Sequence, residues 1–184
     1  SRGTGLSDKY DAPMSDLAYH FTAGVLEHAN SITAFACPTY NSYQGLLAQG
    51  DLVDFSWAPI LVVWGKNNGS AMLRLPLNRH CLENRAVDML GNPNLCAALH
   101  MAAGLEGIRN KADPGEPINL DVYKMSRRDL HAVGIATLPP TLLHALEVFE
   151  VDPLVEEIFG AELRNIFLSQ KMGEWERSFF HVSA

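Results

Sequence analysis

A carboxylate and a guanidinium stand two residues apart in the stretch 81–87, which the sequence predicts to be a strand. Cys81, Glu83, Arg85 and Val87 share one face of it, because strand side chains alternate with period two. An acidic and a basic group on one face can serve a single ligand, with Glu83 holding a metal ion and Arg85 an anionic substrate. The alternative is an ordinary ion pair on a half-exposed strand.

Two further strands are expected just upstream of these residues. The run Ala58–Trp64 is apolar and rich in β-branched residues, which is typical of a buried strand. A turn at 65–69 and a return strand at Ala71–Leu75 follow it. Together with 81–87, these segments predict an antiparallel meander.

Helices are expected on both sides of the strands. Ser15 precedes a helix over 16–35 whose buried stripe is Leu17, Phe21 and Val25. Asn92-Pro93 is a typical helix start, and the small-residue helix that it opens runs to about Arg109, with His100 and Met101 as packing residues.

The C-terminal third is predicted to be helical. One helix is expected over 141–149, and Asp152-Pro153 starts another that ends at Gly160. A long amphipathic helix then covers 161–180, with Leu163, Ile166, Phe167 and Gln170 at helical spacing. A short extended segment at 119–123 and a short helix at 127–133 are expected between the two helical parts.

The bulk properties limit the function classes. A chain of 184 residues is long enough for one domain with a core, and a net charge of −7 without a basic cluster does not suggest a nucleic-acid surface. The three cysteines are odd in number and lack metal-type spacing, which favours free thiols in a cytoplasmic setting. No apolar run reaches the roughly 18 residues needed to span a bilayer, so no membrane partner is expected.

Several blocks in a fixed order resemble the C-terminal catalytic region of glutamine synthetases. The blocks are His20-Phe21, Asn41-Ser42-Tyr43, Asn67-Asn68 with Arg74-x-Pro76, Glu83-x-Arg85 with Asp88 and Asn92-Pro93-x-Leu95, and Asp113-Pro114-Gly115-Glu116-Pro117. Ordered blocks are more specific than any single motif. Trp57-Ala58-Pro59-Ile60 and the tail 152–183 are most similar to the bacterial glutamine-synthetase-like and γ-glutamylamide synthetases.

The resemblance implies an α+β fold, with an antiparallel sheet of a few strands packed with helices and a helical C-terminal third. Residues 15–184 are expected to form the C-terminal part of the catalytic domain, and residues 1–14 a loop or frayed terminus. Family members are longer, so the N-terminal β-grasp domain and the upstream catalytic strands are expected to be absent here. Subunits of the family assemble into homo-oligomeric rings.

The resemblance also implies an activity. Complete enzymes form γ-glutamyl phosphate from glutamate and ATP, with Mg²⁺ or Mn²⁺, and ammonia or a small amine then attacks it. The implied catalytic residues are Arg74, which contacts nucleotide phosphate, and Arg85, which also binds substrate. Asn41, Ser42 and Trp57 are the other implied substrate-binding residues, and Glu83 is the metal ligand. Trp57 either walls an apolar amine pocket or is a core tryptophan.

Three positions depart from the family pattern. Gly45, Gly69 and Cys81 stand where family members carry arginines, and Arg79 would need a shifted path to replace the last of these. The other metal ligands and part of the ATP site lie upstream in the family. We therefore expect this chain alone to bind no cofactor tightly and to have no ligase activity. The alternative is a structural or binding protein whose parent has lost the reaction.

Overall fold

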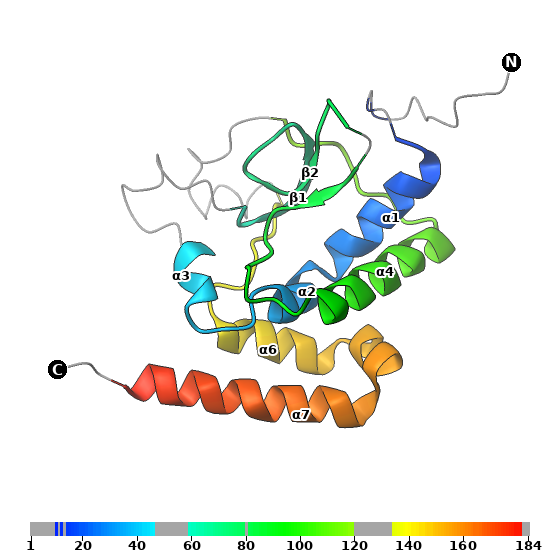
Figure 1. Ribbon diagram of the computed structural model, residues 1–184. Helices are drawn as coiled ribbons and strands as arrows, with labels where there is room; N and C mark the ends of the chain where they lie inside the picture. Colours follow the sequence, from blue (N-terminus) through cyan, green and yellow to red (C-terminus); the bar gives the residue numbers. More distant parts are fainter. Residues whose placement is uncertain are drawn as a thin grey trace, which may run out of the picture.

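The computed structural model describes residues 10, 12, 14–46, 59–79, 81–119 and 134–181. In chain order its elements are α1 (Asp16–Glu27), α2 (Ala29–Ala36), α3 (Ser42–Leu46), β1 (Leu61–Lys66), β2 (Ala71–Leu75), β3 (Glu83–Asn84), α4 (Pro93–Asn110), α6 (Leu142–Val151) and α7 (Pro153–Phe180). The sheet lies at one end, α1 and α4 run side by side below it, and α6 and α7 close the other end (Figure 1). The expected α+β class with a helical C-terminal third is confirmed.

The sheet is short and mixed, in the order β1-β2-β3. β2 and β3 are antiparallel, as predicted, but β1 and β2 are parallel, so the prediction of an antiparallel meander was wrong. Residues 67–70 carry the chain back along β1, so β2 begins with Ala71 beside Leu61. Asn67 makes this reversal with a φ of 49°, and its N–H donates to the Leu75 carbonyl at 2.9 Å.

The expected helix over 16–35 is divided at His28 into α1 and α2. Ser15 caps α1 as predicted, because its hydroxyl accepts from the Ala18 N–H at 3.3 Å. The predicted stripe was partly wrong: Val25 is buried, whereas Leu17 is 60% exposed. The buried residues of α1 are instead Tyr19, Thr22, Ala23, Gly24 and Val25, with Tyr19 against Trp64 of β1 and Gly24 against α4.

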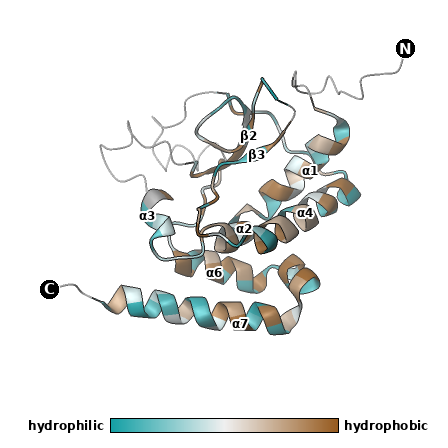
Figure 2. Ribbon diagram, in the orientation of Figure 1, coloured by the Kyte–Doolittle hydropathy of each residue, from teal (hydrophilic) through white to brown (hydrophobic). Residues whose placement is uncertain are grey.

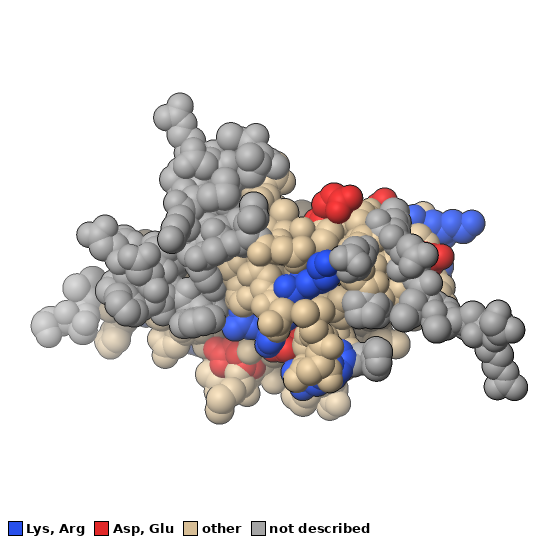
Figure 3. Space-filling view, turned by 90° about the horizontal axis from the view of Figure 1, so that it is seen from above, with Lys and Arg blue, Asp and Glu red and all other residues tan. Residues whose placement is uncertain are grey.

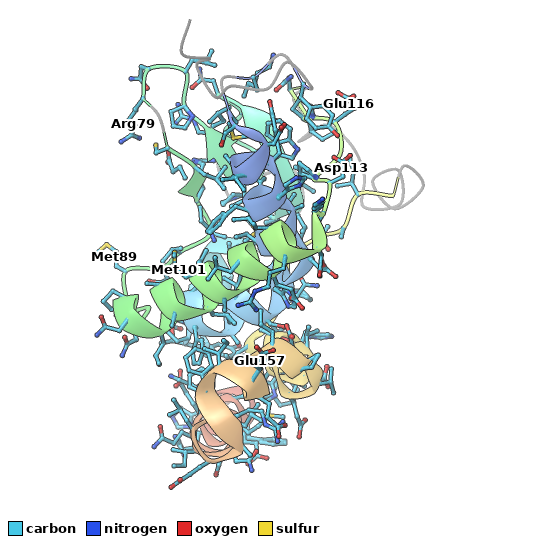
Figure 4. The ribbon with its side chains drawn as sticks, turned by 90° about the vertical axis from the view of Figure 1, so that its right-hand side faces the viewer. Arg79, Met89, Met101, Asp113, Glu116 and Glu157 are labelled. Carbon is cyan, nitrogen blue, oxygen red and sulfur yellow. The ribbon has the colours of Figure 1, made fainter. Side chains whose placement is uncertain are left out.

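The contact between α1 and α4 depends on three glycines without room for a side chain. A Cβ at Gly24 would lie 2.0 Å from the Ala103 carbonyl oxygen, and one at Gly107 would lie 2.2 Å from the His20 oxygen. A Cβ at Gly104 would meet the Phe21 ring at 2.1 Å. The predicted close backbone approach of this helix is therefore present. The face of α4 that carries Met101 points outward, and Met101 is 55% exposed rather than packed (Figure 4).

Side-chain caps start both C-terminal helices, and the one at Asp152 was predicted. The Thr141 hydroxyl accepts from the His144 N–H at 3.3 Å, and the Asp152 carboxylate accepts from the Leu154 N–H at 3.0 Å. Gly160, with a φ of 72°, is non-helical and separates two helical segments that together are labelled α7, so the predicted break at Gly160 is confirmed. Polar and apolar residues alternate along α7 (Figure 2).

The buried face of α7 differs from the predicted stripe. Leu163 and Ile166 are 38% and 48% exposed, whereas Leu168 is buried. The core beneath this face is aromatic: the ring of Phe35 lies 4.9 Å from Phe149 and 4.5 Å from Phe167, centroid to centroid. This cluster joins α2 to the two C-terminal helices.

The remaining predicted elements are less fully tested. Ala12 and Met14 are buried in the core, so this part of the N-terminal segment is packed. The expected helix at 127–133 and most of the expected extended segment at 119–123 lie outside the described residues. Within the described part of the chain, no helix combines the length and apolar character needed to cross a membrane.

His28 links three parts of the helical assembly. Its Nδ1 lies 2.8 Å from an Asp152 carboxylate oxygen at the start of α7, and its Nε2 lies 2.6 Å from a Glu106 carboxylate oxygen on α4. Burial lowers the pKa of His28, but the hydrogen bonds and charges of Asp152 and Glu106 outweigh it, so the pKa of His28 is raised. The same contact lowers the pKa of Asp152 against the raising effect of its burial. We call these three residues the His28 clamp.

The His28 clamp predicts a pH-dependent stability. A raised folded-state pKa stabilises the fold below the unfolded value of about 6.5, and this contribution is lost as pH rises through the folded-state pKa. Asp152 limits the stability on the acid side. Its lowered pKa stabilises the fold at higher pH, and this contribution is lost as pH falls through the folded-state pKa of Asp152. We expect His28→Gln to reduce the free energy of unfolding by about 2 kcal/mol at pH 5.5 and by less at pH 9. Urea unfolding at both pH values measures this, and an equal loss at both would contradict it.

The glycine contact predicts a steric penalty for added side chains. We expect Gly24→Ala to reduce the free energy of unfolding by about 1–3 kcal/mol, because the new methyl group meets backbone that cannot move away. Gly173→Ala on α7 is the matched control, since its Cβ would meet only the end of the Arg177 side chain at 3.3 Å. The control should be neutral or stabilising by up to about 1 kcal/mol. Urea unfolding of the two variants makes the comparison.

Candidate functional site

Three guanidinium groups surround the carboxylate of Glu83. The pairing of β2 with β3 places Arg74 directly opposite Glu83, and Nη1 of Arg74 lies 3.5 Å from Oε2 of Glu83. Nη2 of Arg79 lies 3.3 Å from the same oxygen, and Nε of Arg85 lies 4.0 Å from Oε1. We call Arg74, Arg79, Glu83 and Arg85 the arginine cluster. Three positive charges face one negative charge, so the cluster favours an added anion.

Two of these arginines have buried donors that no group of the described residues satisfies. Nε of Arg74 and Nη1 of Arg85 are buried and lack a hydrogen-bond partner among the described residues. Arg74 is held from its other side, where its Nη2 donates to the Asn67 side-chain oxygen. Because buried donors are normally paired, these two nitrogens are positioned to donate to a bound ligand. An anion with several oxygens, such as a phosphate or a carboxylate, has the matching acceptors.

The arginine cluster is open to solvent at the sheet end of the molecule. Side-chain exposure is 20% for Arg85, 31% for Arg74 and 63% for Arg79. Arg79 projects at this end, far from the C-terminal helices marked by Glu157 (Figure 4). On the face seen in Figure 3, which looks onto this end, basic and acidic side chains adjoin near the centre. A ligand can therefore reach the cluster from water.

Arg79 was expected to need a shifted path to replace the arginine that the family carries at the position of Cys81. Its guanidinium reaches Glu83 and donates to it at 3.3 Å. β3 begins only at Glu83, so Cys81 and Leu82 before it need not follow the alternation of an extended strand. The spacing of four residues between Arg79 and Glu83 was the available signal.

Two of the other predicted binding residues, Asn41 and Ser42, lie beside or on α3. Asn41 is exposed, whereas Ser42 is buried and its hydroxyl lies 2.8 Å from the Thr39 hydroxyl. The Ser42 hydroxyl also accepts from the Thr39 N–H at 3.3 Å, which fixes the turn that starts α3. Gly45 lies within α3, and Trp57 lies outside the described residues.

A metal centre does not form within the described part of the chain. Across 14–46, 59–79, 81–119 and 134–181, no group of three His, Cys, Asp or Glu residues is placed to hold an ion. Glu83 supplies one carboxylate, and arginines face it. A hard divalent cation needs several oxygen ligands, so Glu83 needs carboxylates from elsewhere to act as a metal ligand.

Comparison with known proteins assigns the family and the fold. Residues 4–184 match the glutamine synthetase catalytic domain. The chain belongs to the glutamine synthetase family. Glutamate–methylamine ligase of Methyloversatilis universalis is 41% identical over 177 residues, which are 96% of this chain and 39% of that protein. Glutamine synthetase of Archaeoglobus fulgidus is 34% identical over 175 residues, which are 92% of this chain and 34% of that protein.

A solved structure gives the same result. The structure titled GmaS/ADP complex, conformation 1, superposes with a TM-score of 0.82 at 32% identity, covering 98% of this chain and 40% of that chain. The resemblance to the γ-glutamylamide synthetase subgroup is thereby confirmed. The chain spans about two fifths of the length of the relatives that it matches.

The excess of positive charge predicts metal-free anion binding. We expect inorganic tripolyphosphate to bind the chain in the absence of divalent cations, with an affinity that falls as salt rises. Arg74→Gln should weaken binding about tenfold, because one charge-assisted contact is lost, and Glu83→Gln should strengthen it by removing the opposing charge. Isothermal titration measures both changes.

Arg164→Gln is the matched control for charge. Arg164 lies on α7 and pairs with Glu156, away from the sheet. Its loss changes the net charge as Arg74→Gln does but should leave tripolyphosphate affinity unchanged within about twofold. Equal weakening by both variants would mean that binding follows net charge and not the arginine cluster.

Proposed function

We propose that this chain is the C-terminal catalytic region of an ATP-dependent glutamate–ammonia or glutamate–amine ligase that proceeds through γ-glutamyl phosphate. The observation that carries the proposal is the arginine cluster, whose buried donors have no partner among the described residues. Membership of a ligase family and the likeness to glutamate–methylamine ligase support it.

The arginine cluster fits the phosphate groups of ATP. Arg74, held by Asn67, binds nucleotide phosphate, and Arg85 binds the substrate oxygens at which charge develops. Arg79 adds a third cation beside the exposed Cys81. When bound, ATP supplies the phosphoryl group that activates the substrate carboxylate. Fixed guanidinium groups stabilise the charge of a transferring phosphoryl group, which is the contribution that this chain makes.

The cation and the amine need residues outside the arginine cluster. Glutamine synthetases depend on a divalent metal, and Glu83 contributes one carboxylate to that site only when further ligands are supplied. Asn41 and Ser42, beside α3, and Trp57 bind substrate, and Trp57 forms an apolar wall for an amine. We infer that the chain by itself forms no amide product.

The second candidate function is a structural or binding protein of this family without ligase activity. Gly45, Gly69 and Cys81 favour it, because none of them supplies the guanidinium that the family carries at its position. The reach of Arg79 to Glu83 weakens this argument at one of the three positions. The two candidates differ in whether the arginine cluster binds ATP.

Competition between ATP and tripolyphosphate separates the candidates. The ligase region should bind ATP at the arginine cluster, so ATP should displace tripolyphosphate, and Arg85→Gln should weaken both ligands together by about tenfold. The structural candidate predicts that tripolyphosphate binds without ATP competing. Arg164→Gln again serves as the charge control.

Manganese tests the role of Glu83. Because one carboxylate is insufficient, adding Mn²⁺ should not tighten ATP binding to this chain, and Glu83→Ala should leave the effect of Mn²⁺ unchanged. An assay for γ-glutamylamide formation should detect no product. Saturable Mn²⁺-dependent ATP binding that is lost in Glu83→Ala would overturn the inference that the chain cannot hold the cation alone.

A further inference from the structure

A hydrogen-bonded chain of polar groups runs from α4 to the strand that carries the arginine cluster. Nδ1 of His100 lies 2.7 Å from the Cys96 carbonyl oxygen within α4, and Nε2 of His100 lies 2.7 Å from Nδ2 of Asn84 on β3. The side-chain oxygen of Asn84 accepts from the Ala86 N–H at 2.9 Å. Asn84 therefore sits between Glu83 and Arg85 with both ends of its amide engaged.

The partners fix the proton on each group. A carbonyl oxygen can only accept, so Nδ1 of His100 carries the proton and donates to Cys96. Nε2 is then an acceptor, which suits the amide nitrogen of Asn84. The Ala86 N–H independently requires the oxygen of the same amide to face the other way. The bond from the Asn84 amide nitrogen to Nε2 needs a neutral His100, so all three bonds are satisfied together only in that state.

We propose that His100 is a positioning residue for the arginine cluster, acting through Asn84 to hold Glu83 and Arg85 in place. The inference rests on the proposed function, because it assigns His100 to the same site. The two-residue strand β3 has little pairing of its own, with Leu73 and Arg74 as its only register partners among the described residues. The hydrogen bond between Asn84 and His100 attaches β3 to helix α4 and adds to this short pairing. His100 itself touches no ligand atom and is not a catalytic residue.

The same geometry makes the support depend on the charge of His100. Burial lowers the pKa of His100 from its ordinary value, against the raising effect of the Cys96 carbonyl. Its hydrogen-bond partners in the described structure are Asn84 and Cys96, and the charged residues that flank Asn84 are Glu83 and Arg85. Once protonated, Nε2 would face the Asn84 amide nitrogen donor to donor. The amide must then turn and release the Ala86 N–H.

The test measures tripolyphosphate affinity in three proteins between pH 5 and pH 8. His100→Leu removes the acceptor and should weaken binding about fivefold at pH 8, as the loss of one hydrogen bond allows. His100→Gln keeps an acceptor that does not titrate, so it should bind as the unaltered chain does at pH 8. Tripolyphosphate changes its own protonation with pH equally in all three measurements. The ratio of the dissociation constants of the unaltered chain and His100→Gln at each pH therefore reports the effect of His100 alone.

The expected result is that the unaltered chain loses affinity relative to His100→Gln as pH falls below the pKa of His100. Asn84→Ala should weaken binding by about as much as His100→Leu, and the double variant by no more than either, because both act through one bond. Circular dichroism and urea unfolding show whether each variant folds. If His100→Leu fails to fold, the pH-dependent ratio against His100→Gln still decides.

Three outcomes are distinguishable. No tripolyphosphate binding by the unaltered chain would overturn the proposed function. Binding that Arg74→Gln weakens but His100→Leu and pH leave unchanged would keep the proposed function and overturn the role of His100. Additive losses in the double variant would also overturn it, because they would show that His100 and Asn84 act independently.

Discussion

The close crossing of α1 and α4 is the constraint on which the rest of the structure depends. Gly24 and Gly107 bring the two backbones into contact, and any Cβ there would overlap a carbonyl oxygen or a main-chain nitrogen. The crossing fixes α4, which carries His100, and through His100 the strand that holds Glu83 and Arg85. The site therefore depends on packing far from its own charged atoms. A helix with larger residues at these points could not lie where the strand needs it.

The guanidinium groups of the arginine cluster repel one another, yet the fold holds them close together. One carboxylate offsets only part of the repulsion among the three groups. The register of β2 with β3 nevertheless places Arg74 opposite Glu83, and Asn67 holds it from behind. Such a cluster is pre-organised for an anion, because its donors are oriented before the anion arrives. This is why the same geometry that is unfavourable alone suits phosphoryl chemistry.

The helical part of the chain is joined by charge as well as by apolar packing. Phe35 and Phe149 bury the contact between α2 and α6, while the His28 clamp joins α4 to the start of α7. Asp152 both caps α7 and accepts from His28, so one carboxylate defines where a helix begins and where it docks. Apolar burial supplies most of the stability, and the paired charges fix the relative position of the helices.

Local features of the fold were predictable from the sequence because they rest on neighbouring residues. Ser15, Asn92, Thr141 and Asp152 start helices through bonds to N–H groups two or three residues away, and each of these starts was predicted correctly. Glu83-x-Arg85 was likewise visible as a pair, and its resemblance to glutamine synthetases identified the family. The meander and the Leu17 stripe were wrong, because each depends on what packs against the segment.

The sequence by itself determined the helix starts, the position of β2 and the family, since these follow from local patterns and from ordered blocks of residues. Only the tertiary structure decided that β1 runs parallel to β2 and that Arg79 reaches Glu83. It alone revealed the pairs His28–Asp152 and Asn84–His100, whose members lie 124 and 16 residues apart. The physical reason is that strand direction, buried faces and long-range polar contacts are set by packing between distant segments, which no local pattern specifies.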